Sequence, residues 1–229
     1  MNFVAYTEDE LKEIYEKIRL PEAYFQKSSR RTLPPSPIGR QWTKAFDYPR
    51  TQCILDFRDW VQKYNLQKPR HLGCTFDDFE LKFMSPEKKT VLTYPPHDLH
   101  TLSQTCTEKF DFFIFSQTLE HLYNPYKAVG EIASLVESGG YVFTSVPTIN
   151  IPHSTPIHFS GIYPMGLAVL FLVNGFEVVE MGQWGNLQYI QKMFATHSWP
   201  SYVDLKDKQG KVPNEERNVC QCWILARKK

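Results

Sequence analysis

The sequence predicts an α/β fold with a mainly parallel sheet and helices on both of its faces. Three observations lead to this prediction. From residue 69 onward, short β-type runs alternate with helical patterns, which is the order that gives parallel strands joined by helices. Gly139-Gly140 separates one such helix from the next strand. The last two strand patterns flank a long segment, 182–218, and we expect them to form an antiparallel hairpin at the sheet edge.

The N-terminal quarter is expected to be an arm. Thr7 and Glu10 form a capping box, which predicts a helix over 7–19 that ends before Pro21. Residues 28–50 contain several prolines and predict an irregular segment, because proline fixes φ and removes a backbone donor. We therefore divide the chain into a helix and Pro-rich arm, 1–50, and an α/β domain, 51–229.

The α/β domain is predicted to begin with a helix over 51–64. Its expected strands are 70–73, 90–94, 111–116, 141–146, 176–181 and 220–226. A helix over 125–137 is indicated by Asn124 as N-cap, Pro125 at the first helical position and Gly139 just past the end. A further helix over 164–173 is ended by Asn174-Gly175.

The bulk properties of the chain exclude several classes of protein. Of its 229 residues 42% are hydrophobic and 22% are charged, which is the composition of an ordinary globular domain. No apolar run is long enough for a membrane span, and the first residues do not resemble a secretory signal. The five scattered cysteines are expected to be free thiols, which favours a cytoplasmic location. A net charge of +1 with interleaved signs argues against a nucleic-acid partner.

Several motifs occur together in one order. Asp98-Leu-His-Thr-Leu102 precedes the strand-and-turn segment 110–122, and Asn124-Pro125, Gly139-Gly140 and Val146-Pro147 follow it. This order resembles the second half of class I S-adenosylmethionine-dependent methyltransferases. The resemblance implies a Rossmann-like sandwich and S-adenosylmethionine as the cofactor.

The same resemblance implies a set of cofactor contacts. Asp98 and the backbone amide of Leu99 are expected to bind the adenine edge. The turn after the first strand places Gly73 and Cys74 next to the cofactor. A pocket-lining turn after the 111–116 strand contributes the remaining contacts, which are Ser116, Gln117 and Thr118.

The first half of the family pattern departs from the expected one. The turn after the first strand, 72–76, has one glycine where relatives have three, and the 90–94 strand ends in Tyr94 and prolines instead of a carboxylate. Only 98 − 73 = 25 residues separate Gly73 from Asp98, too few for two further helix-and-strand units. One α/β unit is therefore shortened or lost. Either 90–94 serves as strand two and leads directly into the adenine motif, or strand two has eroded.

The acids after the lone glycine allow two interpretations. Asp77, Asp78 and Glu80 either replace the missing ribose-binding carboxylate or form the solvated first turn of a helix, and we favour the helix turn. The segment 182–186 is predicted to form a shaped loop near the pocket.

Three histidines are candidate catalytic residues. Methyl transfer requires alignment of acceptor, methyl group and sulfur, and a base when the acceptor is a hydroxyl. His121 follows the 111–116 strand, whereas His153 and His158 lie in a lid-like segment, 147–163. Their alternative roles are packing for His121 and solvent exposure for the other two, and His100 is interpreted as a turn residue. A divalent ion on Glu120-His121 with His153 or His158 is a further alternative, but no close ligand spacing occurs, so no metal is predicted.

Three functions remain open. The favoured one is O-methylation of a sugar, glycan or other small-molecule hydroxyl with a histidine base. The second is a catalytically inactive methyltransferase-like domain that binds partners or has a structural role. The third, methylation of nucleic acid or protein, lacks an evident docking face. The sequence leaves the oligomeric state open.

Overall fold

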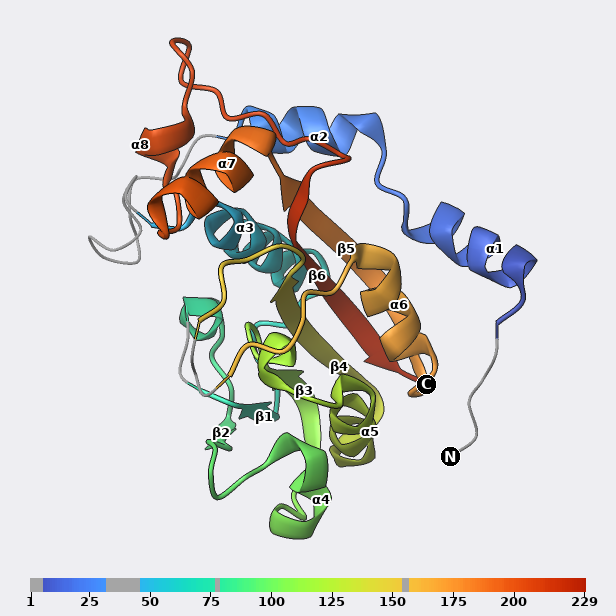
Figure 1. Cartoon of the computed structure of the whole chain (residues 1–229). Helices are drawn as coiled ribbons and strands as arrows, with labels where there is room; N and C mark the ends of the chain where they lie inside the picture. Colours follow the sequence, from blue (N-terminus) through green and yellow to red (C-terminus); the bar gives the residue numbers. More distant parts are fainter. Residues whose placement is uncertain (1–5, 32–45, 77–78, 154–156) are drawn as a thin grey trace.

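The computed structural model describes residues 6–31, 46–76, 79–153 and 157–229 (Figure 1). Its centre is a six-stranded sheet in the order β2-β1-β3-β4-β6-β5. The strands are β1 His71–Cys74, β2 Lys88–Val91, β3 Phe110–Ile114, β4 Val136–Pro147, β5 Phe176–Gly185 and β6 Val219–Lys228. The first four in the spatial order are parallel, and β6 pairs antiparallel with both β4 and β5. The predicted mainly parallel sheet with an antiparallel C-terminal edge is confirmed.

The shortened front of the sheet is also confirmed. β1 connects to β2 through a 3-10 turn, η2 (Phe79–Phe83), and β2 connects to β3 through η3 (Leu99–Thr101) and α4 (Leu102–Thr105). In the described part of the chain no strand pairs with the outer side of β2. β2 therefore leads directly into the segment that begins at Asp98, the first of the two alternatives, although it ends three residues earlier than expected.

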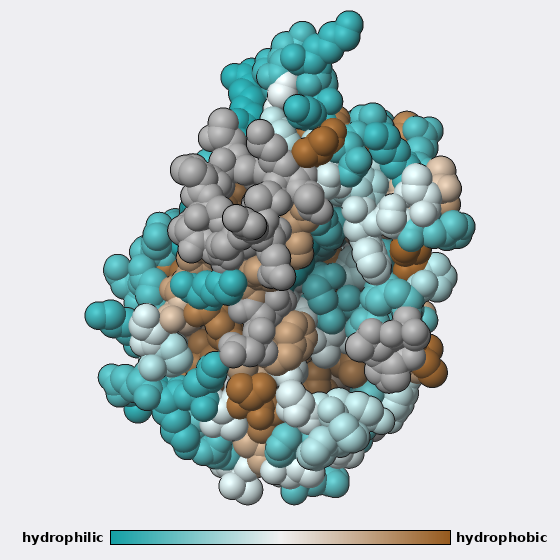
Figure 2. All heavy atoms as spheres, turned by 90° about the vertical axis from the view of Figure 1, so that its left-hand side faces the viewer, coloured by the Kyte–Doolittle hydropathy of each residue, from teal (hydrophilic) through white to brown (hydrophobic). Residues whose placement is uncertain are grey.

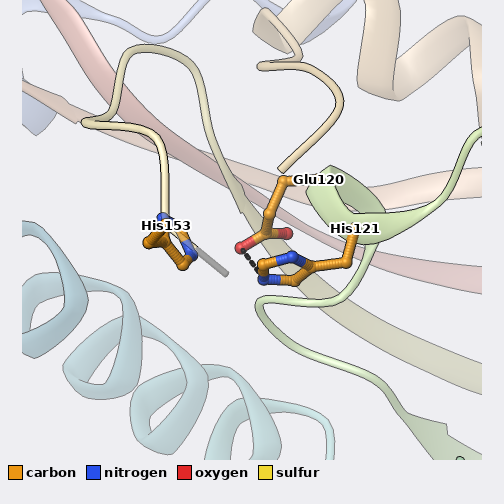
Figure 3. Close-up of side chains that lie close together, drawn as sticks. All are labelled: Glu120, His121 and His153. Atoms are coloured by element: carbon orange, nitrogen blue, oxygen red, sulfur yellow. Dashed lines mark ion pairs between the residues drawn. The ribbon is translucent and has the colours of Figure 1, made fainter. Parts of the chain in front are cut away.

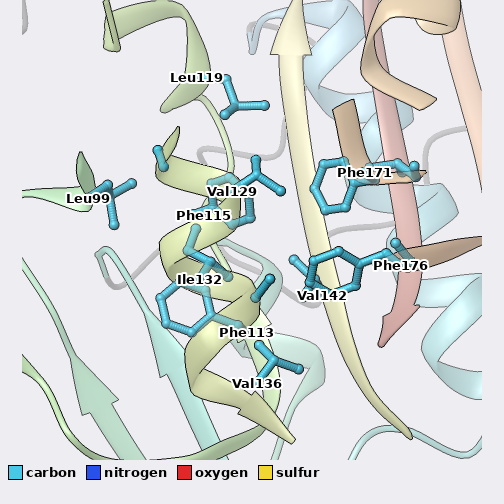
Figure 4. Packing of buried hydrophobic residues seen from close by; sticks show 14 of the residues in the cluster. Leu99, Phe113, Phe115, Leu119, Val129, Ile132, Val136, Val142, Phe171 and Phe176 are labelled. Carbon is cyan, nitrogen blue, oxygen red and sulfur yellow. The ribbon is translucent and has the colours of Figure 1, made fainter. Parts of the chain in front are cut away.

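Helices cover both faces of the sheet (Figure 1). α3 (Tyr48–Lys63), α7 (Leu187–Thr196) and α8 (Tyr202–Leu205) contribute to one buried cluster, whereas α4, α5 (Pro125–Leu135) and α6 (Pro164–Leu172) contribute to the other. β3 supplies both clusters, because successive side chains of a strand point to opposite faces. Phe113 and Phe115 join the cluster around α5 shown in Figure 4, and Phe112 joins the cluster around α3.

The N-terminal segment contains one helix that the sequence predicted and one that it did not. α1 (Glu8–Ile18) has the expected capping box, with Thr7 Oγ1 accepting from the backbone N–H of Glu10. α2 (Glu22–Ser29) begins directly after Pro21. The proline that was expected only to end the first helix therefore also stands at the N-terminus of a second one. Tyr24 of α2 donates to Asp56 of α3 at 2.7 Å and fixes the helix on the domain. The prolines at 34, 35 and 37 lie outside the described residues, and the division at residue 50 stays a prediction.

Three local predictions need correction. α3 begins at Tyr48, three residues before the expected start, because Pro49 fits the first helical turn. β4 begins at Val136, directly after α5, and Gly139-Gly140 lies in an irregular part of this strand instead of a turn. The predicted loop 182–186 is mostly the end of β5, with Trp184 fully buried. None of the described helices is long and apolar enough to cross a membrane.

Candidate active site

A cavity of about 660 Å³ lies where β1, β2 and β3 end. In parallel α/β sheets this carboxyl edge is the usual place for a ligand. Residues following each of the three strands form its wall: Thr75 and Phe76 after β1, Leu92 and Tyr94 after β2, Gln117 and Thr118 after β3. The remaining lining residues are His97, Asp98, Leu99, His100, His121, Leu122, Tyr123, His153, Ile157 and Phe159. Figure 2 shows hydrophobic side chains gathered between hydrophilic ones on this side of the molecule.

Four of the seven expected cofactor residues line this cavity: Asp98, Leu99, Gln117 and Thr118. Asp98 Oδ1 accepts hydrogen bonds from the backbone N–H and the ring Nδ1 of His100, each at 2.8 Å. Partial burial acts to raise the pKa of Asp98, but these two hydrogen bonds outweigh it and the pKa is lowered. Asp98 is therefore a fixed carboxylate at the cavity wall.

The other three, Gly73, Cys74 and Ser116, do not line the cavity. A Cβ atom on Gly73 would lie 2.5 Å from Phe113 Cδ2, so core packing requires the glycine. The Cys74 thiol is buried, with its Sγ 3.8 Å from the Thr90 carbonyl oxygen. Ser116 Oγ donates to Glu80 Oε1 at 2.7 Å. The side chains of Cys74 and Ser116 thus face the protein interior.

Glu80 has neither of the roles considered from the sequence. It is completely buried, and Arg50 binds it through two charge-assisted hydrogen bonds, Nη1–Oε1 at 2.6 Å and Nη2–Oε2 at 2.7 Å. Both carboxylate oxygens are thus occupied within the protein, so Glu80 is neither a solvated helix residue nor a ribose ligand. Asp77 and Asp78, the other two acids considered, lie outside the described residues.

The turn after β3 is held against β4 by backbone and side-chain bonds. Gln117 adopts φ 51°, a left-handed conformation that is uncommon for a residue with a side chain. Its backbone N–H donates to the Ser145 carbonyl at 2.8 Å, and its Nε2 donates to Ser145 Oγ at 3.0 Å. The chain then enters the 3-10 turn η4 (Leu119–His121), which places His121 at the cavity and the buried Glu120 next to it in the sequence.

The structure brings the three predicted catalytic histidines together. The rings of His121 and His153 lie 4.9 Å apart, and the ring of His158 lies 4.8 Å from His153. Glu120 joins them, with its Oε1 3.9 Å from His121 Nε2. Figure 3 shows Glu120, His121 and His153 pointing toward one another from η4 and the segment after β4. Sequence reasoning treated Glu120 only as part of a metal alternative, and its burial was not visible in any pattern.

Burial shifts the proton affinity of this cluster. It raises the pKa of Glu120 to about 8, since the nearly fully buried carboxylate loses its hydration. Burial also lowers the pKa of His121 and His158, with neighbouring histidines acting in the same direction. Both imidazoles are therefore neutral near pH 7, the state in which a histidine ring accepts a proton or binds a metal. His100 also lines the large cavity; its ring stacks on Tyr123 and accepts from the Asn124 backbone N–H, and its role as a turn residue stays a prediction.

A second, smaller pocket of about 200 Å³ adjoins the first, and Gln117, His121 and His153 line both. Its other lining residues are Phe46, Asp47, Pro49, Arg50, Glu120, Pro147, Ile149, Asn150, Tyr189, Trp199, Cys220 and Gln221. Trp199 Nε1 donates to Asn150 Oδ1 at 2.8 Å, which holds an aromatic face at this pocket. Gln221 Nε2 is buried without a hydrogen-bond partner among the described residues. Two molecules bound in the two hollows would meet at the histidines.

Residues 72–144 match the family model for a methyltransferase domain. This match covers the first strands, the cavity turn and η4, and it confirms the resemblance found in the sequence. No curated protein matches the chain by sequence.

Solved structures with a similar chain path include the following three proteins. Magnesium protoporphyrin IX methyltransferase from Synechocystis PCC 6803, with bound S-adenosylhomocysteine, is 13% identical, with coverage of 96% of this chain and 94% of that chain and a TM-score of 0.47. The N-methyltransferase NodS from Bradyrhizobium japonicum WM9 is 10% identical, with coverages of 90% and 98% and a TM-score of 0.48. TehB from Haemophilus influenzae is 13% identical, with coverages of 76% and 62% and a TM-score of 0.42.

Proposed function

We propose, from the premise that residues 72–144 form a methyltransferase domain, that the chain transfers a methyl group from S-adenosylmethionine to a hydroxyl of a sugar, glycan or other small molecule. The observation that carries the proposal is the meeting of the two pockets at His121 and His153. A donor in the large cavity and an acceptor in the small one would face each other across these rings. Such an arrangement supplies the proximity that methyl transfer needs.

The large cavity fits the cofactor in size and in the character of its wall. A volume of about 660 Å³ lies within the range of cofactor sites. Leu92, Leu99 and Leu122 offer apolar walls for an adenine ring, with the Asp98 carboxylate at the same wall. Thr75 Oγ1 is buried without a partner among the described residues, and it lines the cavity as a free hydrogen-bonding group. When bound, the cofactor supplies an electrophilic methyl group on a positively charged sulfur.

The small pocket favours a polar acceptor. Gln221 Nε2 and Glu120 Oε2 are buried, and neither has a hydrogen-bond partner among the described residues. A hydroxylated acceptor would satisfy both groups, since a hydroxyl both donates and accepts. The exposed ring of Trp199 offers the apolar face on which sugars stack. These features support O-methylation of a sugar or similar hydroxyl over transfer to an apolar acceptor.

A histidine of the cluster accepts the acceptor proton in this proposal. Neutral imidazole near pH 7 is suited to that role, and the lowered pKa of His121 and His158 keeps both rings neutral. The buried Glu120 lies beside them and adds a second group able to hold a proton.

A catalytically inactive domain is the second candidate. The observations that favour it are the turn after β1, where the lone Gly73 serves the core, and the absence of a carboxylate directly after β2. A domain of this kind would retain the fold and bind partners through its surface.

Calorimetric titration of the full chain with S-adenosylmethionine and with S-adenosylhomocysteine separates the two candidates. We expect saturable binding of both, and at 100 times Kd a gain of about 2.7 kcal/mol in unfolding free energy. Asp98→Ala is expected to weaken binding, whereas the exposed Asp9→Ala serves as control. No binding of either compound at millimolar concentration would leave the inactive domain as the function.

Transfer itself is measured with S-adenosylmethionine labelled in its methyl group and a panel of sugars and small alcohols. His121→Ala and His153→Ala are expected to lower turnover more than cofactor affinity. Unchanged turnover in both variants would remove the histidine base from the proposal.

A further inference from the structure

We propose that Glu120, His121 and His153 bind a divalent transition-metal ion at the junction of the two pockets. One ligand atom from each residue lies within 4.8 Å of the others. Ligands bound at about 2.0–2.2 Å from an ion lie roughly 3–4 Å from one another, so a small inward movement completes the site. The distance between Glu120 Oε1 and His121 Nε2 is already 3.9 Å.

The hydrogen bonds of the two histidines orient their rings for this role. His121 Nδ1 lies 3.0 Å from the Ile157 carbonyl oxygen, and His153 Nδ1 lies 3.1 Å from the Ile151 carbonyl oxygen. A carbonyl oxygen can only accept, so each Nδ1 carries the proton and each Nε2 keeps its lone pair free. Metal-binding histidines typically donate their other ring N–H to a backbone carbonyl or carboxylate in this way.

Glu120 supplies an independent observation. Its side chain is 1% exposed, and its Oε2 has no hydrogen-bond partner among the described residues. A buried carboxylate without compensation is costly, and binding to a cation is one of the ways in which proteins offset that cost. The other oxygen of this carboxylate, Oε1, lies 3.9 Å from His121 Nε2, and the three side chains point toward one another (Figure 3).

The donor set indicates the class of ion. Two imidazoles and one carboxylate suit Zn²⁺, Mn²⁺, Fe²⁺ or Co²⁺, whereas Mg²⁺ and Ca²⁺ prefer oxygen ligands. Three protein ligands leave at least one position for water or for an oxygen of the acceptor. The sequence analysis expected no metal because the candidate ligands show no close spacing in the chain. His153 lies far from Glu120 and His121 in the sequence, so spacing rules for ligands on one element do not detect this cluster.

The use of such an ion in catalysis rests on the proposed function. An acceptor hydroxyl bound to the ion loses its proton more readily, because the positive charge stabilises the alkoxide. The ion would also hold the acceptor oxygen at the side of the small pocket that faces the cofactor cavity. His158, whose Nδ1 is buried without a partner among the described residues, is left beside the site to receive the proton.

Titration of the chelator-treated full chain with CoCl₂, followed by visible absorption and calorimetry, tests the site directly. We expect saturable binding of one Co²⁺ per chain. His153→Ala and Glu120→Gln are each expected to weaken that binding at least about tenfold. The matched controls His197→Asn and Glu13→Gln change exposed residues outside the cluster and are expected to bind Co²⁺ as the wild type does. Circular dichroism verifies that each variant is folded.

Two outcomes would overturn the site. One is no saturable Co²⁺ binding up to about 1 mM, a Kd that corresponds to a binding free energy of about −4 kcal/mol. The other is Co²⁺ binding that both Glu120→Gln and His153→Ala leave unchanged. Parallel titration with S-adenosylhomocysteine separates this failure from failure of the proposed function. Binding of S-adenosylhomocysteine without Co²⁺ removes the metal site alone. Binding of Co²⁺ without S-adenosylhomocysteine removes the methyltransferase and leaves the metal site in place.

Discussion

Substitution of Gly73 by alanine tests whether this glycine serves the cofactor or the core. The added Cβ would lie 2.5 and 2.7 Å from two ring atoms of Phe113 and 2.9 Å from Phe110 Cδ1. Ordinary carbon contacts are about 3.5–4.0 Å, so the overlap is about 1 Å against rings that are completely buried. Overpacking of this kind costs about 1–3 kcal/mol. For a chain of this size we expect a fall in Tm of about 2–4 °C per kcal/mol.

Urea denaturation followed by tryptophan fluorescence measures this cost. Gly166→Ala is the matched control, because Gly166 lies in α6 and its Cβ would meet only Ile162 Cγ2, at an ordinary 3.5 Å. Alanine has the higher helix propensity, so this control is expected to leave the protein unchanged or more stable by up to about 1 kcal/mol. If the free energy of unfolding of Gly73→Ala lies within about 0.5 kcal/mol of the wild-type value while its affinity for S-adenosylmethionine falls, the glycine serves the cofactor and our explanation is wrong.

Three further predictions concern stability and reactivity. Glu80→Gln removes the charge that compensates buried Arg50 and should lower the free energy of unfolding, measured by urea denaturation, by about 3–5 kcal/mol. The control Glu87→Gln changes an exposed residue and should leave that free energy almost unchanged. A loss below about 1 kcal/mol for Glu80→Gln would show that the ion pair is hydrated. Burial raises the pKa of Cys222 from 9.0 to about 12, so the fraction of thiolate at pH 8 is about a thousandfold lower than in an ordinary thiol. Iodoacetamide should therefore label Cys222 only after denaturation, and rapid labelling of the native protein would contradict this prediction. Asn124 is the N-cap of α5, and its Oδ1 accepts a hydrogen bond from the backbone N–H of Lys127 at 3.0 Å. Asn124→Ala removes this cap and should lower the unfolding free energy by about 1 kcal/mol. An unchanged value would mean that solvent replaces the cap.

The parts of the fold that the sequence predicted are those with local signals. Asn124 and Pro125 mark the start of α5 because a side-chain cap and a preset φ act within one turn. The lost α/β unit followed from chain length alone, since 25 residues cannot form the missing elements. The antiparallel edge followed from the long segment between the last two strands, which is now seen to contain α7 and α8.

The parts that the sequence did not predict depend on tertiary contacts. α2 was missed because it is fixed by Tyr24 and Arg31 bonding to Asp56, residues far away in the sequence. The end of β5 was read as a loop because its glycines suggest turns. Gly182 instead makes room for the Trp223 ring, whose Nε1 would lie 2.1 Å from an added Cβ. In both cases the decisive partner belongs to another element.

The candidate site shows the same limit more sharply. His121 and His153 are 153 − 121 = 32 residues apart, and the segment after β4 returns over η4 through backbone bonds. The Phe159 N–H donates to the Glu120 carbonyl at 2.7 Å, and the Ile162 N–H donates to the Pro147 carbonyl at 3.1 Å. Backbone atoms carry no side-chain signature, so no residue pattern announces this return. A lack of close histidine spacing therefore argues against ligands on one helix, but it does not argue against a cluster assembled by a returning loop.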